Sequence, residues 1–388
     1  MTDTMSLDRA YIAGTYSRFP VEIVSGKGCL VRAADGREYI DLTSGIGVTS
    51  FGMADERWQQ AVIDQLGRVQ HTSNLYYTRP DARLAQMLCE RTGMKKVFFS
   101  NSGAEANECA VKVARKWAAE HKGADCYTVI TLVNSFHGRT LSTLAATGQD
   151  SFHRHFQPLT PGFVHTPAND LPAFTALAKA CNPAAVLIEC VQGEGGVTAL
   201  EPEFVRGVAE YAQRENILLM VDEVQTGNGR TGTLYSYMHY GVQPDVVSTA
   251  KGLGGGLPLG ATLLGEKVEG VLGPGDHGST FGGNPVCCAG ALSILERLDD
   301  ELMAEVQKKS RMAFDMLRDA PGVEGVSGMG LMIGVKPVKP ASEVVLKCME
   351  RGVLCLTAKD KVRLLPALNI PVEMLQRALE ILRAACAE

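Results

Sequence analysis

Strong charge of one sign, long apolar runs and Cys-x-x-Cys motifs are all missing from this 388-residue chain. Its formal net charge of −5 provides no general attraction to nucleic acid or to an anionic membrane. No run of eighteen apolar residues occurs, and the N-terminus has no basic region followed by an apolar one. We therefore expect a cytoplasmic protein with neither nucleic acid nor membrane as a partner.

The cysteines and histidines do not form a metal-binding pattern. There are 11 cysteines, an odd number, and their scattered spacing contains no Cys-x-x-Cys pair, which favours reduced and buried thiols. His153 and His155 form a His-x-His sequence, but no cysteine or carboxylate cluster accompanies it. No metal site is predicted.

Strand-like apolar runs alternate with helical runs through the middle of the chain. The strand-like runs cover residues 128–133, 184–189 and 217–221, and the helical runs cover residues 171–180 and 203–215. This alternation predicts an α/β fold with a largely parallel sheet that helices cover on both faces. In such sheets, ligands bind at the carboxyl ends of the strands.

Shorter patterns flank this region. They are a hairpin from 28–31 to 39–42, helices over 55–68 and 80–91, a long helix that starts after 285 and continues with a break to 318, and a last helix over 372–387. The segments beyond residue 330 suggest a smaller α+β domain. The chain length agrees with about two structural units.

Lys251 lies in a glycine-rich loop directly after the strand-like run 245–248. The glycines from 252 to 260 let a ligand approach the backbone closely. A confined pocket lowers the pKa of a lysine, and the neutral amine attacks carbonyl groups. A lone lysine in a loop is more often a surface residue, so this interpretation depends on the other motifs.

Ser102, Gly103 and Ala104 join a strand-like run, 96–100, to a helix that continues to Lys122. The free amides and the dipole at the start of a helix favour an anion, and phosphate suits such a turn. An ordinary strand-to-helix turn with Ser102 as the N-cap is equally consistent with the sequence. Both interpretations remain open at this point.

Asp222 ends an apolar strand-like run, and one βαβ-like passage could place it beside Lys251. A carboxylate there can keep a pyridine nitrogen protonated, because a nearby opposite charge favours the charged form. A protonated pyridine ring accepts electrons. Together with a reactive lysine, a phosphate-binding turn and a stacking aromatic residue, this set predicts pyridoxal phosphate chemistry.

Over nearly its whole length the chain resembles the class III, fold-type I, pyridoxal phosphate-dependent aminotransferases, and seven motifs in order carry this resemblance. They are His71-Thr72-Ser73-Asn74-Leu75-Tyr76, Ser102-Gly103-Ala104-Glu105-Ala106-Asn107, Phe136-His137-Gly138-Arg139-Thr140, Gln192-Gly193-Glu194-Gly195-Gly196, Asp222-Glu223-Val224-Gln225-Thr226-Gly227, Ala250-Lys251-Gly252 and Gly278-Ser279-Thr280-Phe281-Gly282-Gly283-Asn284-Pro285. The resemblance implies a large cofactor-binding domain over residues 51–285 with a mostly parallel, seven-stranded sheet. It also implies a small α+β domain over 286–388, to which residues 1–50 contribute.

The resemblance assigns a role to each cofactor contact. Lys251 would bind pyridoxal 5'-phosphate covalently and later move the proton, and Asp222 would pair with the ring nitrogen. Gln225 would contact the phenolic oxygen, Phe136 would stack on the ring, and residues 102–104 would hold the phosphate.

The resemblance also assigns the substrate contacts and a homodimer with a shared active site. Thr280 would reach the phosphate of the partner subunit. Arg139 would bind the α-carboxylate of the amine substrate, since a guanidinium can bind a carboxylate through two hydrogen bonds. Arg363 would bind the α-carboxylate of glutamate or 2-oxoglutarate, and Glu194 would neutralise Arg363 while the amine is bound.

The reaction that this resemblance implies is transfer of an amino group from N-acetylornithine to 2-oxoglutarate, which gives N-acetylglutamate 5-semialdehyde and glutamate in arginine biosynthesis. Ornithine, succinylornithine and 4-aminobutyrate aminotransferases are alternatives with the same machinery. A decarboxylase or aminomutase, or a non-catalytic regulator that binds the cofactor, would be an alternative of another class. The Glu194 and Arg363 pair favours exchange between two substrates.

Two positions depart from the family pattern and leave the choice of amine open. Met53 lies in 51–55, where relatives commonly have a turn with histidine and proline. Asn228 takes the place of an expected aromatic residue after 222–227.

Overall fold

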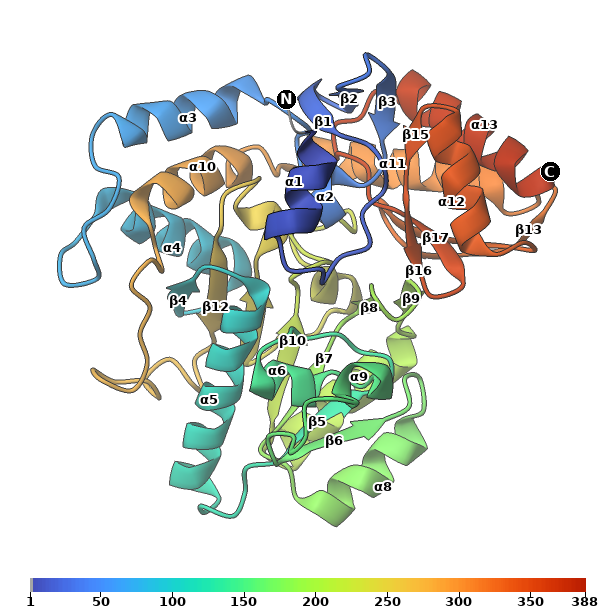
Figure 1. The fold of residues 1–388 in the computed structure, drawn as a ribbon. Coiled ribbons are helices and arrows are strands. Elements are labelled where there is room, and N and C mark those ends of the chain that lie inside the picture. The colour runs from blue at the N-terminus through green and yellow to red at the C-terminus, as the bar shows by residue number, and fades with distance from the viewer. Residues whose placement is uncertain (1–2) are drawn as a thin grey trace.

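The centre of the molecule is a seven-stranded sheet, seen in a computed structural model that describes residues 3–388 (Figure 1). In spatial order the strands are β4 (Lys96–Ser100), β12 (Gly260–Leu264), β11 (Val246–Thr249), β10 (Leu218–Asp222), β7 (Ala185–Ile188), β5 (Val129–Leu132) and β6 (Phe163–Thr166). Only β12 runs antiparallel to its neighbours among these strands. The predicted α/β fold with a mostly parallel sheet is confirmed.

Helices cover both faces of this sheet, and as a result every residue of its inner strands is buried. Along β10, Leu218 and Met220 belong to the same core as the apolar stripe of α5 (Gly103–His121). Leu219 and Val221 belong to the core that includes α8 (Leu171–Cys181) and α9 (Pro202–Arg214). Side chains alternate between the two faces of a strand, so a continuous apolar run fits a sheet covered on both sides. Each large aliphatic side chain buried in this way contributes roughly 1.5–3 kcal/mol.

Two further four-stranded sheets lie outside this unit, in addition to the short pair of β8 (Val191–Gln192) and β9 (Thr198–Ala199). One contains β13 (Val323–Met329), β14 (Met332–Pro337), β17 (Lys361–Leu364) and β16 (Leu356–Ala358), and its neighbouring elements are α11 (Asp300–Leu317), α12 (Ala341–Glu350) and α13 (Val372–Ala387). The other contains β1 (Ile23–Lys27), β2 (Leu30–Ala33), β3 (Glu38–Asp41) and β15 (Val353–Leu354). The predicted hairpin is the antiparallel pair β2 and β3. The domain bounds at residues 50 and 285 stay a prediction.

The remaining helices connect these sheets or pack beside them. They are α1 (Thr4–Tyr11), α2 (Ser44–Gly47), α3 (Glu56–Leu66), α4 (Arg79–Thr92), α6 (Leu141–Ala146), α7 (Asp150–His153), the 3-10 helices η1 (Ser236–Tyr240) and η2 (Lys251–Leu253), and α10 (Pro285–Leu295). The predicted break in the long helix falls between α10 and α11, where the side chain of Asp299 accepts a hydrogen bond from Leu302 N and caps the second helix.

The connection from β10 to β11 differs from the predicted βαβ-like passage. Between these parallel neighbours the chain forms η1 and loops but no α-helix. Buried Glu223 holds this connection in place, because its carboxylate accepts hydrogen bonds from Thr226 Oγ1, Ser236 Oγ and Tyr237 N. The two strands still lie side by side, with Asp222 opposite Ser248.

Within residues 3–388, no helix is both long enough and apolar enough to cross a membrane. The 11 cysteines are unpaired, and only Cys89 and Cys181 are not fully buried.

Candidate functional site

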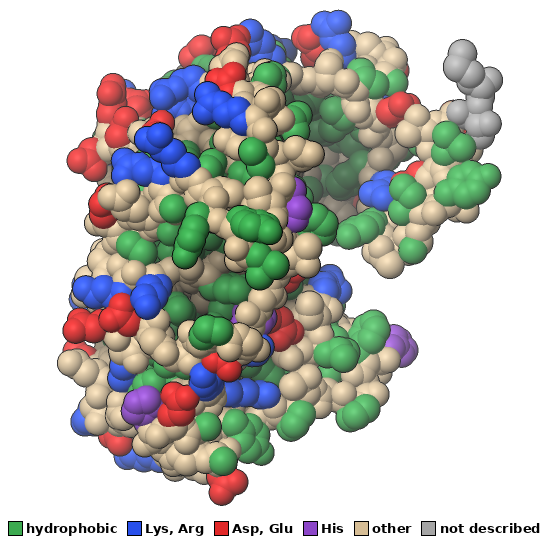
Figure 2. Space-filling view, turned by 90° about the vertical axis from the view of Figure 1, so that its left-hand side faces the viewer, with side chains coloured by type: hydrophobic (Ala, Val, Ile, Leu, Met, Phe, Trp, Pro, Cys, Tyr) green, Lys and Arg blue, Asp and Glu red, His purple; other side chains and the backbone are tan. Residues whose placement is uncertain are grey.

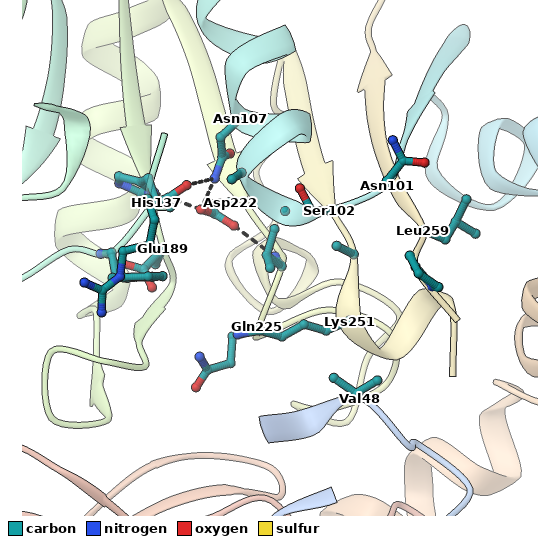
Figure 3. A pocket seen from close by; sticks show the side chains of 18 of the residues that line it. Val48, Asn101, Ser102, Asn107, His137, Glu189, Asp222, Gln225, Lys251 and Leu259 are labelled. Atoms are coloured by element: carbon teal, nitrogen blue, oxygen red, sulfur yellow. Dashed lines mark hydrogen bonds and ion pairs between the residues drawn. The ribbon is translucent and has the colours of Figure 1, made fainter. Parts of the chain in front are cut away.

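A cavity of about 460 Å³ opens where the carboxyl ends of β4, β10 and β11 meet (Figure 3). Eight of the residues predicted from the sequence line it: Ser102, Gly103, Ala104, Phe136, Arg139, Asp222, Gln225 and Lys251. Strands that are separated in sequence therefore bring these side chains to one edge of the sheet, where ligands of such sheets bind.

Lys251 begins η2, directly after β11, and its side chain is half-buried beside the cavity. Its φ of +45° lies in the left-handed region, which is unfavourable for a residue other than glycine or asparagine and persists only where surrounding contacts impose it. Burial lowers the pKa of the Lys251 amine, and the charge of Arg363 lowers it further, although Glu194 and Asp222 act in the opposite direction. The amine is thus held closer to its neutral, nucleophilic form.

Asp222 ends β10, and three donors fix its buried carboxylate (Figure 3). Its Oδ2 accepts hydrogen bonds from Asn107 Nδ2 at 2.7 Å and from His137 Nδ1 at 2.8 Å, and its Oδ1 accepts from Val224 N at 2.9 Å. Ser248 in turn donates to Asn107 Oδ1 at 2.5 Å. Burial opposes a charge on His137, but the hydrogen bond to Asp222 raises the pKa of this histidine above its ordinary value.

Glu189 is a second buried carboxyl group at the cavity, and sequence analysis gave it no role beyond the end of a strand. Phe136 N donates a hydrogen bond to its Oε2 at 2.9 Å. Burial raises the pKa of Glu189 to about 7. The charges of His137 and Asp222 act on the same group in opposite directions, so the three form one electrostatic unit.

The start of α5 forms the turn at which an anion site is predicted, and residues 102–104 line the cavity. Ser102 is the N-cap, and its hydroxyl accepts a hydrogen bond from Glu105 N, while the amides of the first turn have no acceptor within a helix. A Cβ at Gly103 would lie 2.6 Å from Val224 Cγ1, so this position requires glycine. The two interpretations left open by the sequence are therefore compatible: Ser102 caps the helix whose N-terminus faces the cavity.

Arg363, on β17, brings the C-terminal part of the chain to the same site. Its Nη1 donates to Glu194 Oε1 at 2.5 Å and to Gln225 Oε1 at 3.1 Å. Gln225 Nε2 donates to Glu194 Oε1 at 3.3 Å, which closes the network. Burial alone would raise the pKa of Glu194, but the Arg363 guanidinium holds it below its ordinary value. Glu194 therefore stays ionised and neutralises the arginine.

Arg139 lines the cavity without a carboxylate partner among residues 3–388. Its guanidinium lies 4.2 Å from the ring centroid of Phe152 and 5.5 Å from that of Phe136. Stacking on aromatic rings orients a guanidinium and leaves its edge free for bidentate binding of a carboxylate.

Thr280 is not brought to this cavity within one chain. It lies in a separate small hollow with residues of the 71–78 segment, and the ring of neighbouring Phe281 is 5.3 Å from that of His71. Met53, the first departure from the family pattern, also lies outside the cavity, and its backbone pairs with Gly28. Asn228, the second departure, is buried.

The set of residues around the cavity fits a phosphorylated pyridine aldehyde. A helix N-terminus suits the phosphate, an amine of lowered pKa suits the aldehyde, and a carboxylate held by three donors suits the ring nitrogen. Phe136 and Val224 provide apolar surfaces for the ring. Asn107, His137 and Glu189 support this site without having been predicted to do so, although the first two lie inside the motifs 102–107 and 136–140.

Comparison with known proteins places the chain in a family. The family description Aminotransferase class-III matches residues 11–386. Acetylornithine aminotransferase of Haemophilus ducreyi is 51% identical over 98% of this chain and 98% of its own length. The namesake from Methanocaldococcus jannaschii is 41% identical over 95% of this chain and 94% of its own.

Solved structures agree with that placement. Ornithine aminotransferase of Toxoplasma gondii superposes with a TM-score of 0.94 at 34% identity, covering 99% of this chain and 93% of that one. N-acetylornithine aminotransferase of Stenotrophomonas maltophilia superposes with a TM-score of 0.86 at 35% identity, covering 99% and 98%. The resemblance seen in the sequence is thereby confirmed, and this chain belongs to the class III aminotransferases.

Proposed function

We propose that this protein is a pyridoxal phosphate-dependent aminotransferase that moves the δ-amino group of N-acetylornithine to 2-oxoglutarate. The products are N-acetylglutamate 5-semialdehyde and glutamate, and the setting is arginine biosynthesis in the cytoplasm. The network of Arg363, Glu194 and Gln225 beside Lys251 is the observation that carries this proposal. The relatives named acetylornithine aminotransferase support the choice of substrate.

The cofactor contacts follow from the cavity. The T. gondii relative has pyridoxal phosphate in its active site at partial occupancy. Pyridoxal phosphate supplies an aldehyde that combines with amines and a ring that stabilises negative charge on the neighbouring carbon. Residues 102–104 would hold its phosphate, Asp222 its ring nitrogen, Gln225 its phenolic oxygen, and Phe136 one face of its ring.

Lys251 carries two duties in this proposal. Its Nζ would hold the aldehyde carbon of the cofactor at rest, for which a neutral amine is required. With a substrate amine in its place, the freed Nζ would move a proton from the substrate carbon to the cofactor carbon. A general base works best when its pKa lies near the operating pH, and burial shifts Lys251 in that direction.

Arg139 and Arg363 divide the two substrates between them. While the amine is bound, Arg139 holds its carboxylate. Glu194 meanwhile neutralises Arg363, so the amine substrate does not have to supply a second carboxylate for this arginine. When 2-oxoglutarate enters, Glu194 releases Arg363, whose guanidinium then binds the α-carboxylate. One cavity can thus accept a substrate with a single carboxylate and then a substrate with two.

A panel of amines tests this choice. With 2-oxoglutarate as acceptor, kcat/KM for N-acetylornithine should exceed that for ornithine, N-succinylornithine and 4-aminobutyrate by at least about tenfold, because a pocket that fits one acyl group discriminates by roughly that amount. Much slower turnover of N-acetylornithine than of another amine would refute the substrate. Carbon dioxide release without amino transfer would point to a decarboxylase, and no reaction with any amine would point to a regulator.

We also propose a homodimer in which Thr280 reaches the phosphate bound by the partner subunit. The segments around Thr280 present large apolar side chains, since Phe281 is 61% exposed and Tyr76 is 71% exposed. Figure 2 shows hydrophobic side chains spread over the face where α3, α4 and α10 lie. Burying such a surface against a second copy would be favourable.

Light scattering and subunit mixing test the dimer. The expected mass is about twice the chain mass of 41.6 kDa. Thr280→Val should weaken cofactor binding by about tenfold, because one hydrogen bond to a charged phosphate is lost. Mixing this variant with an inactive Lys251→Ala chain should restore one complete site per mixed dimer. A monomer with full activity would contradict the proposal.

A further inference from the structure

We propose that Asn228 is a positioning residue that fixes the backbone immediately before Lys251. Its Nδ2 donates hydrogen bonds to Thr249 Oγ1 at 3.1 Å and to Ala250 O at 3.2 Å. The amide thus holds the two residues that lead from β11 into η2. This inference rests on the proposed role of Lys251 in the reaction.

The turn that Asn228 holds has an unfavourable backbone. Lys251, directly after Ala250, has φ +45°, which lies in the left-handed region. Such a conformation persists only where surrounding contacts impose it. Ala250 O accepts a second hydrogen bond, from Leu253 N at 2.9 Å. Two donors therefore use both lone pairs of this carbonyl oxygen, which leaves the peptide before Lys251 little freedom to rotate.

The hydrogen-bond acceptor at Ala250 determines which way the Asn228 amide is oriented. Ala250 O can only accept a hydrogen bond, so the amide nitrogen must face it and the amide oxygen must point away. Asn228 Oδ1 indeed has no partner among residues 3–388. The side chain is therefore used as a donor, and an aromatic residue at this position could not replace it.

The local backbone also suits asparagine. Asn228 has φ +57° and is 2% exposed, and asparagine tolerates the left-handed region better than most residues. A Cβ at Gly252 would lie 3.2 Å from Asn228 Cβ and 2.8 Å from Ser50 Oγ. The loop that contains Asn228 consequently packs closely against η2, and its amide reaches the peptide before Lys251 over a short span.

Asn228→Gly tests the hydrogen bonds separately from the backbone, because glycine keeps the left-handed conformation and removes only the side chain. Asn216→Gly is the matched control. Asn216 also has a left-handed backbone, with φ +49°, but it is exposed and lies before β10 at the opposite end from the cavity. Both variants would be studied as cofactor-loaded, full-length protein.

Two measurements are expected to change together in Asn228→Gly. Amide hydrogen exchange of residues 249–254, followed by mass spectrometry, should become at least about fivefold faster, because the variant loses both hydrogen bonds and the loss of one of ordinary strength already corresponds to about that factor. The kcat should fall by about tenfold, since a displaced Nζ moves the proton less well, while KM for both substrates stays within about twofold. Asn216→Gly should change neither quantity.

Any other pattern would overturn the proposal. Unchanged exchange would show that the amide does not hold the turn, and faster exchange with normal kcat would show that the held turn does not position Lys251. Faster exchange throughout the sheet would assign Asn228 a general structural role. If Asn228→Gly does not fold, Asn228→Ser, whose hydroxyl is too short to reach Ala250 O, replaces it. The exchange measurement needs no substrate, so a different preferred amine would leave this test intact.

Discussion

Replacing Lys251 by alanine is expected to lower kcat by more than about 10⁴-fold, because it removes both the covalent attachment of the cofactor and the group that moves the proton. Each of these contributions is large by itself. They also lie in one side chain, so no neighbour can compensate: Glu194 and Arg363 are occupied by one another, and Asp222 already accepts from three donors.

Mass spectrometry after chemical reduction gives a second measurement that does not depend on turnover. The reduced wild-type protein should carry the mass of the cofactor on Lys251, and the variant should carry none. Lys27→Ala is the control, since this lysine side chain is 82% exposed and pairs only with an exposed glutamate. A Lys251→Ala protein with normal activity would refute the assignment of the active site.

Local patterns in the sequence predicted the buried strands and the amphipathic helices well. The runs around β5, β7 and β10 are continuous and apolar because helices cover both faces of these strands. The predicted last helix over residues 372–387 has the bounds of α13. These features depend on a few neighbouring residues, so they can be recognised from short segments.

Features that depend on distant contacts were not predicted. Strand β12 directly follows the glycine-rich loop and inserts antiparallel between β4 and β11, an order that no local pattern encodes. Likewise, β15 pairs with β3 from the other end of the chain. The connection before β11 lacks an α-helix because buried Glu223 supplies hydrogen bonds to its irregular backbone.

The residues of the candidate site also differ in whether a local sequence pattern or a distant contact determines their role. Lys251 could be singled out by its glycine-rich loop, and Asp222 by its place at the end of an apolar strand. Asn107 and His137 could not be given their roles, since an asparagine within a helix and a histidine in a loop carry no local signal. Their function depends on Asp222, which lies 115 residues from Asn107 in the chain and becomes its neighbour only in the folded sheet.

Arg363→Ala is expected to lower kcat/KM for 2-oxoglutarate by about 10²–10³-fold, the loss that corresponds to a bidentate hydrogen bond between charged groups. The half-reaction with the amine should change far less, because Arg139 holds that carboxylate in the proposed mechanism. Following the absorbance of the bound cofactor after mixing with each substrate alone separates the two half-reactions. Arg214→Ala is the control, since this arginine pairs with Glu215 on the surface.

Glu194→Gln distinguishes neutralisation of Arg363 from simple contact. Glutamine can still accept the hydrogen bond from Arg363 Nη1 but carries no charge, so Arg363 remains an unbalanced cation beside Lys251. The amine half-reaction should then slow, whereas binding of 2-oxoglutarate should be unchanged or tighter. If instead both half-reactions weakened equally in Glu194→Gln, the carboxylate would act as an ordinary structural partner, and alternating use of Arg363 by two substrates would be wrong. The opposite responses expected of Arg363→Ala and Glu194→Gln therefore follow from one ion pair that is hydrogen-bonded to Gln225 in the wall of the cavity.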